Sequence, residues 1–271
     1  MRKALPAIAL TLAAVSAAHG QDRPGDCAGA LKGPVRSVRV VRAVYSSAGG
    51  RSVEGARRLV SVTVYSEDRR RSEETRYDEA GKVRHIFVRA CYDDGRAAEN
   101  TLFDAERRPL RRVVFSRDGG ELVRLDAAGQ VVRREVFARD AEGRQTVTAY
   151  DGAGVLVYHS VSGLDGGKSV ATGYDGEGRL TGRSVGGAVG GGLYQRDDYR
   201  YSPDGTVATH STVMSDAGKG LRRWEADGLR QEERREYDRR GNLRKVARYV
   251  QHPVTGAMVQ SSTYYYEITY F

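Results

Sequence analysis

The sequence contains few of the residues that usually build a catalytic or metal centre. Its 271 residues include 2 cysteines, 5 histidines and a single tryptophan. The histidines after the first twenty residues are widely spaced, and none belongs to an HxH or HExxH motif: His85, His159, His210 and His252. Zinc sites need ligands gathered at short spacings, so this pattern is typical of a sheet surface. We expect no metal, no cofactor and no enzymatic activity.

Long apolar runs are absent after the first twenty residues. The opening MRKALPAIALTLAAVSAAHG has a basic head, an apolar centre from Leu5 to Ala14 and small residues before Gln21. This is the layout of a secretory signal peptide, and its apolar centre is too short for a membrane-spanning helix. We expect a signal peptide at 1–20, a linker at 21–30 and one β domain at 31–271. The protein should be periplasmic or secreted, with no transmembrane segment after the signal peptide.

The two cysteines, Cys27 and Cys91, are expected to form a disulfide, because an exported protein matures under oxidising conditions. Such a bridge would stabilise the fold by roughly 2–4 kcal/mol in the chain-entropy model. Two separate buried thiols are the alternative. Neither cysteine belongs to a CxxC motif or has a nearby histidine in the sequence, so neither indicates catalysis.

The net charge is +9, and removal of residues 1–20 takes away Arg2 and Lys3 and lowers it by two, to +7. A positive surplus favours polyanions. The arginines, however, alternate with acids, as in RRRSEETR (69–76) and RQEERREYDRR (230–240). Because no tail or block is purely basic, we expect a solvated face of mixed charge and no nucleic-acid partner.

A short motif recurs along the chain, as YDEAGKV from Tyr77, LDAAGQV from Leu125, YDGAGVL from Tyr150, YDGEGRL from Tyr174 and YDRRGNL from Tyr237. Aspartate at the first position of a type I turn accepts a backbone hydrogen bond, and glycine at the fourth position adopts positive φ. A type I turn followed by such a glycine makes a hairpin with a bulge. The motif therefore predicts hairpin tips with these turn residues: Asp78, Gly81, Asp126, Gly129, Asp151, Gly154, Asp175, Gly178, Asp238 and Gly241.

The motif has a nearly constant period. With the weaker copy FDAERRPL, which has lost the glycine, tips begin at residues 77, 103, 125, 150 and 174, in steps of 26, 22, 25 and 24 residues. A steady period indicates a repeat architecture. The segments between tips, such as KVRHIFVRACY and SSTYYYEITYF, are rich in Val, Tyr and Thr and alternate with polar residues, which predicts strands with one buried face. No convincing amphipathic helix follows residue 20.

The copies YDEAGKV, YDGAGVL, YDGEGRL and YDRRGNL resemble the YD repeats of Rhs-family proteins, which also occur in teneurins and in the C components of insecticidal toxin complexes. The resemblance covers residues 31–271, and LKGPVRSVRVVRAVY (31–45) looks like the first strand of short exported members. It implies an all-β fold in which hairpins wind into a twisted or spiral antiparallel sheet. No toxin domain follows the repeats, and the chain is too short to close a shell around a folded cargo. We therefore expect an open or partly curled sheet.

Two glycine-containing stretches have the letters of functional motifs without their context. GRSVG (182–186) is spaced like a serine-nucleophile elbow and GGAVGGG (186–192) like a phosphate cradle, but both motifs need a following helix. LYQRDDYRY, which comes next, predicts a strand. We interpret GGAVGGG as a flexible loop or wide hairpin tip that contacts a partner. Exposed aromatic residues beside arginines suit binding, and Tyr194, Tyr199 and Trp224 are the candidate partner contacts.

An outer-membrane β-barrel is a competing architecture, because the chain ends in phenylalanine. Counting back by twos from Phe271 gives Thr269, Glu267, Tyr265 and Thr263. A lipid-facing strand would not carry Glu267, and many other strands are rich in arginine. We disfavour this alternative.

These observations predict a non-enzymatic exported repeat protein with a binding or structural role at the cell envelope or surface. Its partner would be an envelope glycan or a protein, and open edge strands could associate with a partner strand. Two alternatives stay open. One is a hydrolase acting on an envelope or extracellular polymer, with carboxylates gathered from several hairpins. The other is a basic β protein that binds polyanions.

Overall fold

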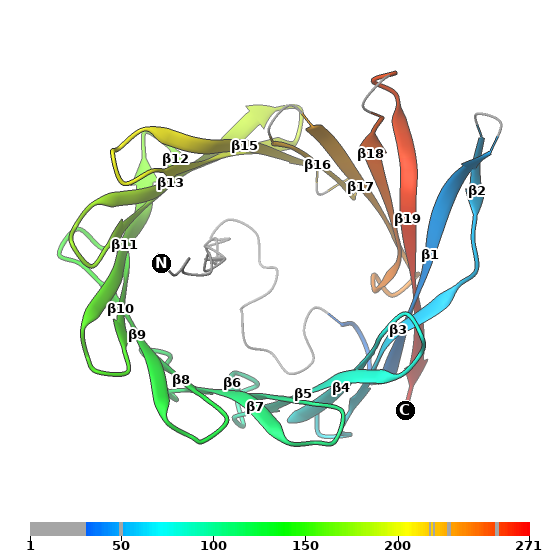
Figure 1. Ribbon diagram of the computed structural model, residues 1–271, viewed down its shortest axis with the longest axis horizontal. Helices are drawn as coiled ribbons and strands as arrows, with labels where there is room; N and C mark the ends of the chain where they lie inside the picture. Colours follow the sequence, from blue (N-terminus) through cyan, green and yellow to red (C-terminus); the bar gives the residue numbers. More distant parts are fainter. Residues whose placement is uncertain (1–30, 49–50, 217, 219, 227–228, 253–254) are drawn as a thin grey trace, which may run out of the picture.

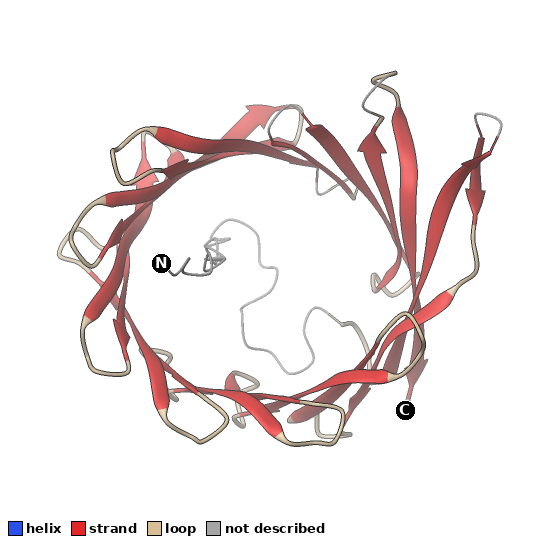
Figure 2. Ribbon diagram, in the orientation of Figure 1, coloured by secondary structure: helices blue, strands red, loops and turns tan. Residues whose placement is uncertain are grey.

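The computed structural model describes residues 31–271 except 49–50, 217, 219, 227–228 and 253–254. The predicted signal peptide and linker therefore lie outside the described residues. The described part of the chain is built from nineteen strands and holds no helix (Figure 2). The strands are β1 (Val35–Ala48), β2 (Arg51–Glu54), β3 (Arg58–Tyr65), β4 (Arg71–Tyr77), β5 (Val83–Cys91), β6 (Ala97–Phe103), β7 (Pro109–Phe115), β8 (Glu121–Leu125), β9 (Val131–Arg139), β10 (Gln145–Asp151), β11 (Leu156–Asp165), β12 (Lys168–Asp175), β13 (Leu180–Gly190), β14 (Leu193–Tyr201), β15 (Val207–Asp216), β16 (Leu221–Ala226), β17 (Leu229–Tyr237), β18 (Leu243–Gln251) and β19 (Met258–Tyr270).

The sheet closes on itself, so the prediction of an open or partly curled sheet is wrong (Figure 1). Each strand from β3 to β19 pairs with the next, and β1 pairs with both β3 and β19. β2 pairs only with the end of β1, which leaves eighteen strands in a closed antiparallel barrel. We call the β1–β19 pairing, from Val35 with Tyr270 to Val44 with Ser262, the seam.

Two physical effects explain the closure. Register shifts occur beside the hairpin tips, for example at Tyr77, Tyr174 and Tyr237, and each such bulge bends its strand and increases the local twist. Repeated along the chain, these bends curl the sheet further than a plain ladder would curl. Pairing β1 with β19 then satisfies the backbone donors and acceptors that two open edges would leave exposed.

The repeated motif forms the tips with one geometry. Asp78 Oδ1 accepts hydrogen bonds from the backbone nitrogens of Ala80 and Lys82, both at 2.9 Å, and Gly81 has a φ of 79°. Tyr77 and Val83 pair across this tip. The same arrangement occurs at the tips of Asp126, Asp151, Asp175 and Asp238. At the weaker copy Arg107 takes the glycine position with a φ of 62°.

Neighbouring strands run in opposite directions, so the tips alternate between two rims of the barrel. The tips that follow Tyr77, Phe103, Leu125, Tyr150 and Tyr174 end even-numbered strands and share one rim. The last copy, after Tyr237, ends the odd-numbered β17 and therefore lies at the opposite rim. The seam also ends at that rim, which places this tip beside the start of β1 and the end of β19.

The barrel is wide enough to leave a lumen. Eighteen strands about 4.8 Å apart give a backbone diameter of roughly 27 Å before strand tilt is counted. Inward side chains that reach about 6 Å from each wall leave a clear width of about 15 Å, and barrels of this strand number are too wide for side chains to fill. The expectation that the chain is too short to close a shell around a folded cargo stays a prediction, although the sheet itself does close.

Burial is spread over both faces of the wall. Val38 and Val41 point to opposite faces because they are three residues apart in a strand, yet they are only 7% and 6% exposed. Thr263, Asn242 and Glu232 are also buried. We had expected strands with one buried face. In this wall, each of the two faces carries buried side chains.

We had expected GGAVGGG (186–192) to form a flexible loop or a wide hairpin tip, but most of it belongs to a strand. Gly186 to Gly190 belong to β13, and only the tip between Gly190 and Leu193 turns. A Cβ on Gly186 would overlap the hydroxyl of Tyr194 on the neighbouring strand. The glycine is therefore part of a packed strand, where an aromatic ring covers the position that a side chain would occupy.

Candidate binding site on the inner wall

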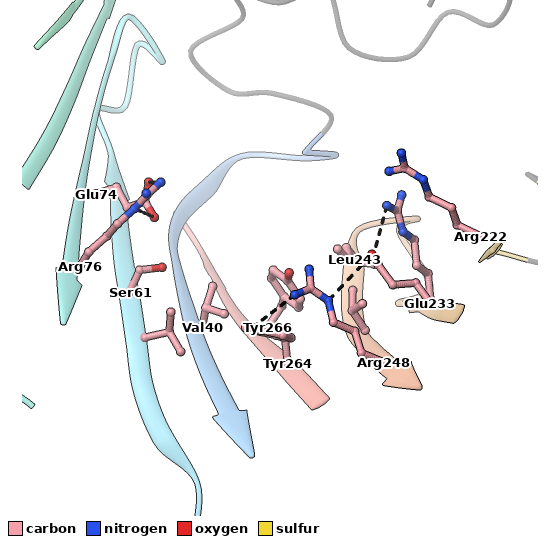
Figure 3. Close-up of a pocket in the computed structure, with 13 residues that line it drawn as sticks. Val40, Ser61, Glu74, Arg76, Arg222, Glu233, Leu243, Arg248, Tyr264 and Tyr266 are labelled. Atoms are coloured by element: carbon pink, nitrogen blue, oxygen red, sulfur yellow. Dashed lines mark hydrogen bonds and ion pairs between the residues drawn. The ribbon is translucent and has the colours of Figure 1, made fainter. Parts of the chain in front are cut away.

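Side chains on the concave side of the wall surround an open hollow between β3–β4 and β16–β18 (Figure 3). In this view, Glu74 and Arg76 on one side and Arg222 and Glu233 on the other point toward one another across β1 and β19. Side chains of a closed ring converge only on its inner side, so these residues face the lumen. The hollow has a volume of about 740 Å³, within the range of small-molecule sites. Its lining residues are Val40, Val60, Ser61, Glu74, Arg76, Arg222, Glu233, Arg235, Leu243, Val246, Arg248, Tyr264 and Tyr266.

At the β4 end of the hollow, one arginine and one glutamate are paired with each other. Arg76 donates from Nε and an Nη atom to the two carboxylate oxygens of Glu74, at 2.9 and 3.0 Å. This side-chain hydrogen bonding raises the pKa of Arg76 above its usual value. The two-fold contact fixes both side chains and leaves no net charge at this end.

At the β16–β18 end, three arginines surround one glutamate. Arg222, Glu233 and Arg248 pair across β16, β17 and β18, and Arg235 is two residues from Glu233 on the same strand face. Glu233 lies 3.7 Å from Arg235 and 3.9 Å from Arg248, which are ion-pair distances too long for hydrogen bonds. Arg222 forms no ion pair with a carboxylate of the described residues. This end of the hollow is therefore positive.

Two tyrosines of β19 form the floor of the hollow. Two guanidinium groups lie near the Tyr264 ring, with Arg248 4.8 Å and Arg42 5.7 Å from its centroid. Tyr266 pairs with Val40 across the seam. Burial raises the pKa of the Tyr266 hydroxyl above its usual value, so the group stays neutral. The floor thus presents flat aromatic and apolar surface beside cationic donors.

The outward face carries its own ion pairs, one residue away from the hollow along each strand. Arg39 and Glu267 pair at 2.8 Å on β1 and β19. On β16–β17, Glu232 pairs with Arg223 at 2.7 Å and with Arg234 at 2.6 Å. Charged side chains are costly in contact with lipid. These outward ion pairs are of a kind expected beside water. The closed barrel itself is the architecture that the sequence analysis disfavoured.

The structure does not bring the candidate partner contacts together. Trp224 lies two residues from the inward-facing Arg222 on β16, so it faces inward as well. Tyr194 pairs with Ser215, and Ser215 pairs with Arg222. Directly opposite residues share a face of the sheet, so Tyr194 also belongs to the inner face. Tyr194 also bonds to Ser169 at 2.8 Å. Tyr199 is on the outward face, where its ring stacks on His210 at 4.5 Å.

The cysteines and histidines were the other residues considered for a bond or a metal site. Cys91 ends β5 and is not a free thiol, whereas Cys27 lies outside the described residues, so the pairing stays a prediction. His210 lies 3.4 Å from Asp197. No group of three or more potential metal ligands occurs among the described residues.

The residues that line the hollow were not singled out from the sequence. They come from strands at both ends of the chain, and only the seam brings them together: Val40 and Arg76 at one end, and Arg222, Arg248 and Tyr264 at the other. The alternation of each strand could have predicted which residues share a face. It could not have predicted which face is concave.

No protein-family model and no curated protein matches the chain. Among solved structures, a porin-like protein from Bacteroides uniformis is similar at 11% identity and a TM-score of 0.45, over 88% of this chain and 98% of that chain. A protein of unknown function from Bacteroides fragilis is similar at 12% identity and a TM-score of 0.20, over 53% of this chain and 85% of that one.

The structure of TcdB2–TccC3–Cdc42 is similar at 11% identity and a TM-score of 0.15, over 84% of this chain and 17% of that one. All three scores are below 0.5, so these likenesses support no statement about fold or function, and membership of the YD-repeat family stays a prediction. The described residues contain no helix that could span a lipid bilayer.

Proposed function

We propose that the chain is an exported, non-enzymatic binding protein that takes an envelope glycan into its lumen. The observation that carries this proposal is the hollow on the inner wall, with Tyr264 and Tyr266 on its floor and guanidinium groups around them. A sugar presents apolar ring faces and a rim of hydroxyls. Aromatic surface beside multiple N–H donors complements both. A periplasmic or secreted location is part of the proposal and rests on the predicted signal peptide at 1–20.

The width of the lumen favours an extended chain as the occupant. A clear width of about 15 Å admits a polysaccharide strand. A folded domain of about 100 residues has a radius of gyration near 13 Å and would not enter. The two chain ends of the barrel pair with each other in the seam, so addition of a partner strand at an open edge is not part of the proposal.

The hollow supports binding rather than hydrolysis. Its two carboxylates, Glu74 and Glu233, belong to β4 and β17, which are five strand spacings apart in the ring. That separation corresponds to roughly 20 Å between the two backbones and to about 12 Å between carboxylates that reach about 6 Å into the lumen. The paired acids of glycosidases lie about 5–9.5 Å apart. Each carboxylate of the hollow also forms an ion pair with an arginine.

The first test is binding by the mature chain from Gln21. The protein is immobilised and exposed to envelope fractions and defined oligosaccharides, and bound glycan is identified by mass spectrometry. Trp224, the single tryptophan, is on the inner face, so its fluorescence should change when a glycan enters the lumen. We expect a saturable change with the retained glycan.

A matched pair of variants separates the lumen from the outer surface. Tyr264→Ala removes an inner ring that lies under Arg248, and Tyr249→Ala removes an outward ring that lies under Arg234 at 4.6 Å. We expect Tyr264→Ala to weaken binding by about 1–3 kcal/mol and Tyr249→Ala to leave it unchanged. Equal loss in both variants, or retention of proteins but no glycan, would contradict the proposal.

A further inference from the structure

The charged side chains of the hollow are not balanced. Four arginines and two glutamates line it. Glu74 and Arg76 compensate each other at the β4 end. The surplus of two positive charges is therefore concentrated at the β16–β18 end, where Arg222, Arg235 and Arg248 share the single carboxylate of Glu233.

The three arginines also keep donors available. A guanidinium group has five N–H donors, and Glu233 is 3.7 Å from Arg235 and 3.9 Å from Arg248. The Arg235 and Arg248 side chains are 37% and 46% exposed, so their terminal nitrogens can reach a ligand in the lumen. An oxyanion with two or three acceptor oxygens would accept hydrogen bonds from these donors and neutralise the surplus charge.

The cationic end adjoins the aromatic floor. Arg248 belongs to both, because its guanidinium lies 4.8 Å from the Tyr264 centroid and beside Glu233 (Figure 3). A ligand that places a ring on Tyr264 would therefore hold a substituent of that ring close to the arginines. Rings that carry an ionised oxygen group fit this arrangement.

We propose that Arg222, Arg235 and Arg248 form an anion subsite that makes the lumen selective for acidic glycans, whose carboxylate or phosphate group contacts these arginines while the sugar ring lies on Tyr264 and Tyr266. This inference rests on the proposed glycan-binding function and adds the class of glycan. It also assigns a function to part of the +7 surplus of the mature chain, which the sequence shows only as charge scattered among acids.

The experiment compares two probes that differ only in charge. An oligomer of a uronic acid, and the same oligomer with its carboxylates reduced to alcohols, are titrated into the mature chain at low and high salt while Trp224 fluorescence is followed. We expect the acidic oligomer to bind at least ten-fold more tightly at low salt. Salt should erase most of that preference, because it screens the charges.

Two variants on one strand locate the effect. Arg235→Gln removes an inner charge, and Arg230→Gln removes an outward charge that pairs with the exposed Glu225 at 2.9 Å. We expect Arg235→Gln to lose the preference for the acidic oligomer by about ten-fold and Arg230→Gln to keep it. A circular-dichroism spectrum of each variant shows whether the barrel is intact, and Arg222→Gln replaces Arg235→Gln if that variant does not fold.

The outcomes separate the two proposals. Equal binding of acidic and reduced oligomers would overturn the anion subsite and leave the glycan-binding function standing. Binding of neither oligomer, together with no glycan retained from envelope fractions, would overturn both. A single-stranded oligonucleotide that binds as tightly as the acidic oligomer, with the same loss in Arg235→Gln, would overturn acidic glycan as the ligand class.

Discussion

At the scale of single residues, Asn242 gives the last copy of the repeat contacts with residues near both ends of the described chain. Its side chain donates to the backbone oxygen of Lys32 at 2.9 Å and to the Tyr270 hydroxyl at 3.0 Å, and it is 1% exposed. Tyr270 in turn donates to Asp238 of the same tip at 3.1 Å. This asparagine therefore connects the last hairpin tip to β19 and to the segment that precedes β1.

Replacement of Asn242 by alanine should destabilise the barrel by about 1–3 kcal/mol, because it leaves buried polar groups without partners. The measurement is the urea midpoint at fixed pH. Asn100→Ala is the control, because the half-buried Asn100 accepts one bond from Arg89 at 3.2 Å and lies away from the seam. Equal losses in the two variants would contradict a special role for Asn242.

A second residue-scale prediction concerns two neighbouring glycines of β13. A Cβ on Gly186 would overlap the Tyr194 hydroxyl, whereas a Cβ on Gly187 would meet the flexible Lys168 side chain at 3.3 Å. Gly186→Ala should cost about 1–3 kcal/mol by overpacking, and Gly187→Ala less than about 0.5 kcal/mol. Thermal unfolding of both variants checks this, and a neutral Gly186→Ala would show that Tyr194 does not cover the strand.

At the scale of elements, the β1–β2 hairpin is attached to β19 by a cluster around Glu54. This carboxylate accepts hydrogen bonds from Tyr45 at 2.8 Å, Arg57 at 2.9 Å and Tyr265 at 3.0 Å. The Arg57 guanidinium lies 4.0 Å from the Tyr265 ring centroid. Burial and the hydrogen bonds with Tyr45 and Glu54 raise the pKa of Tyr265 to about 12.

This pKa shift predicts an alkaline loss of stability. Because the folded-state pKa of Tyr265 lies above its ordinary value of 10.0, its contribution is fully present below pH 10 and is lost as the pH rises towards 12. The difference in urea midpoint between the natural chain and Tyr265→Phe should therefore shrink over this range. A difference that stays constant from pH 8 to pH 12 would contradict the prediction.

At the scale of the whole molecule, ring closure is the property that creates the lumen and the hollow. It places Ser37 and Thr269, which are 232 positions apart in the sequence, side by side, with their hydroxyl oxygens 2.5 Å apart. An open sheet would put these residues on opposite edges. An engineered disulfide between these two positions would therefore distinguish a closed barrel from an open sheet.

The double variant Ser37→Cys/Thr269→Cys should form an intramolecular disulfide on oxidation of the dilute chain from Gln21, because the two positions lie directly opposite each other in an antiparallel pair, where Cβ atoms are about 4.5–5.5 Å apart. Non-reducing electrophoresis and intact mass report the bond. The control is Ser37→Cys/Thr146→Cys, with the second residue on β10 across the barrel. Failure of the seam pair to cross-link faster than the control would mean that the sheet is open.

The sequence by itself determined the local structure of this protein. Asp and Gly at fixed spacing specify a turn through side-chain hydrogen bonds and positive φ, so the tips and the strands between them follow from residues that lie within seven positions of one another. The all-β class follows from the same information. The tertiary structure alone decided that the ends of the sheet meet, because small bends at many tips add up to a curvature that no single repeat contains. For the same reason only the tertiary structure decided which face is concave, and thus brought Tyr264, Arg222 and Arg76 to one hollow.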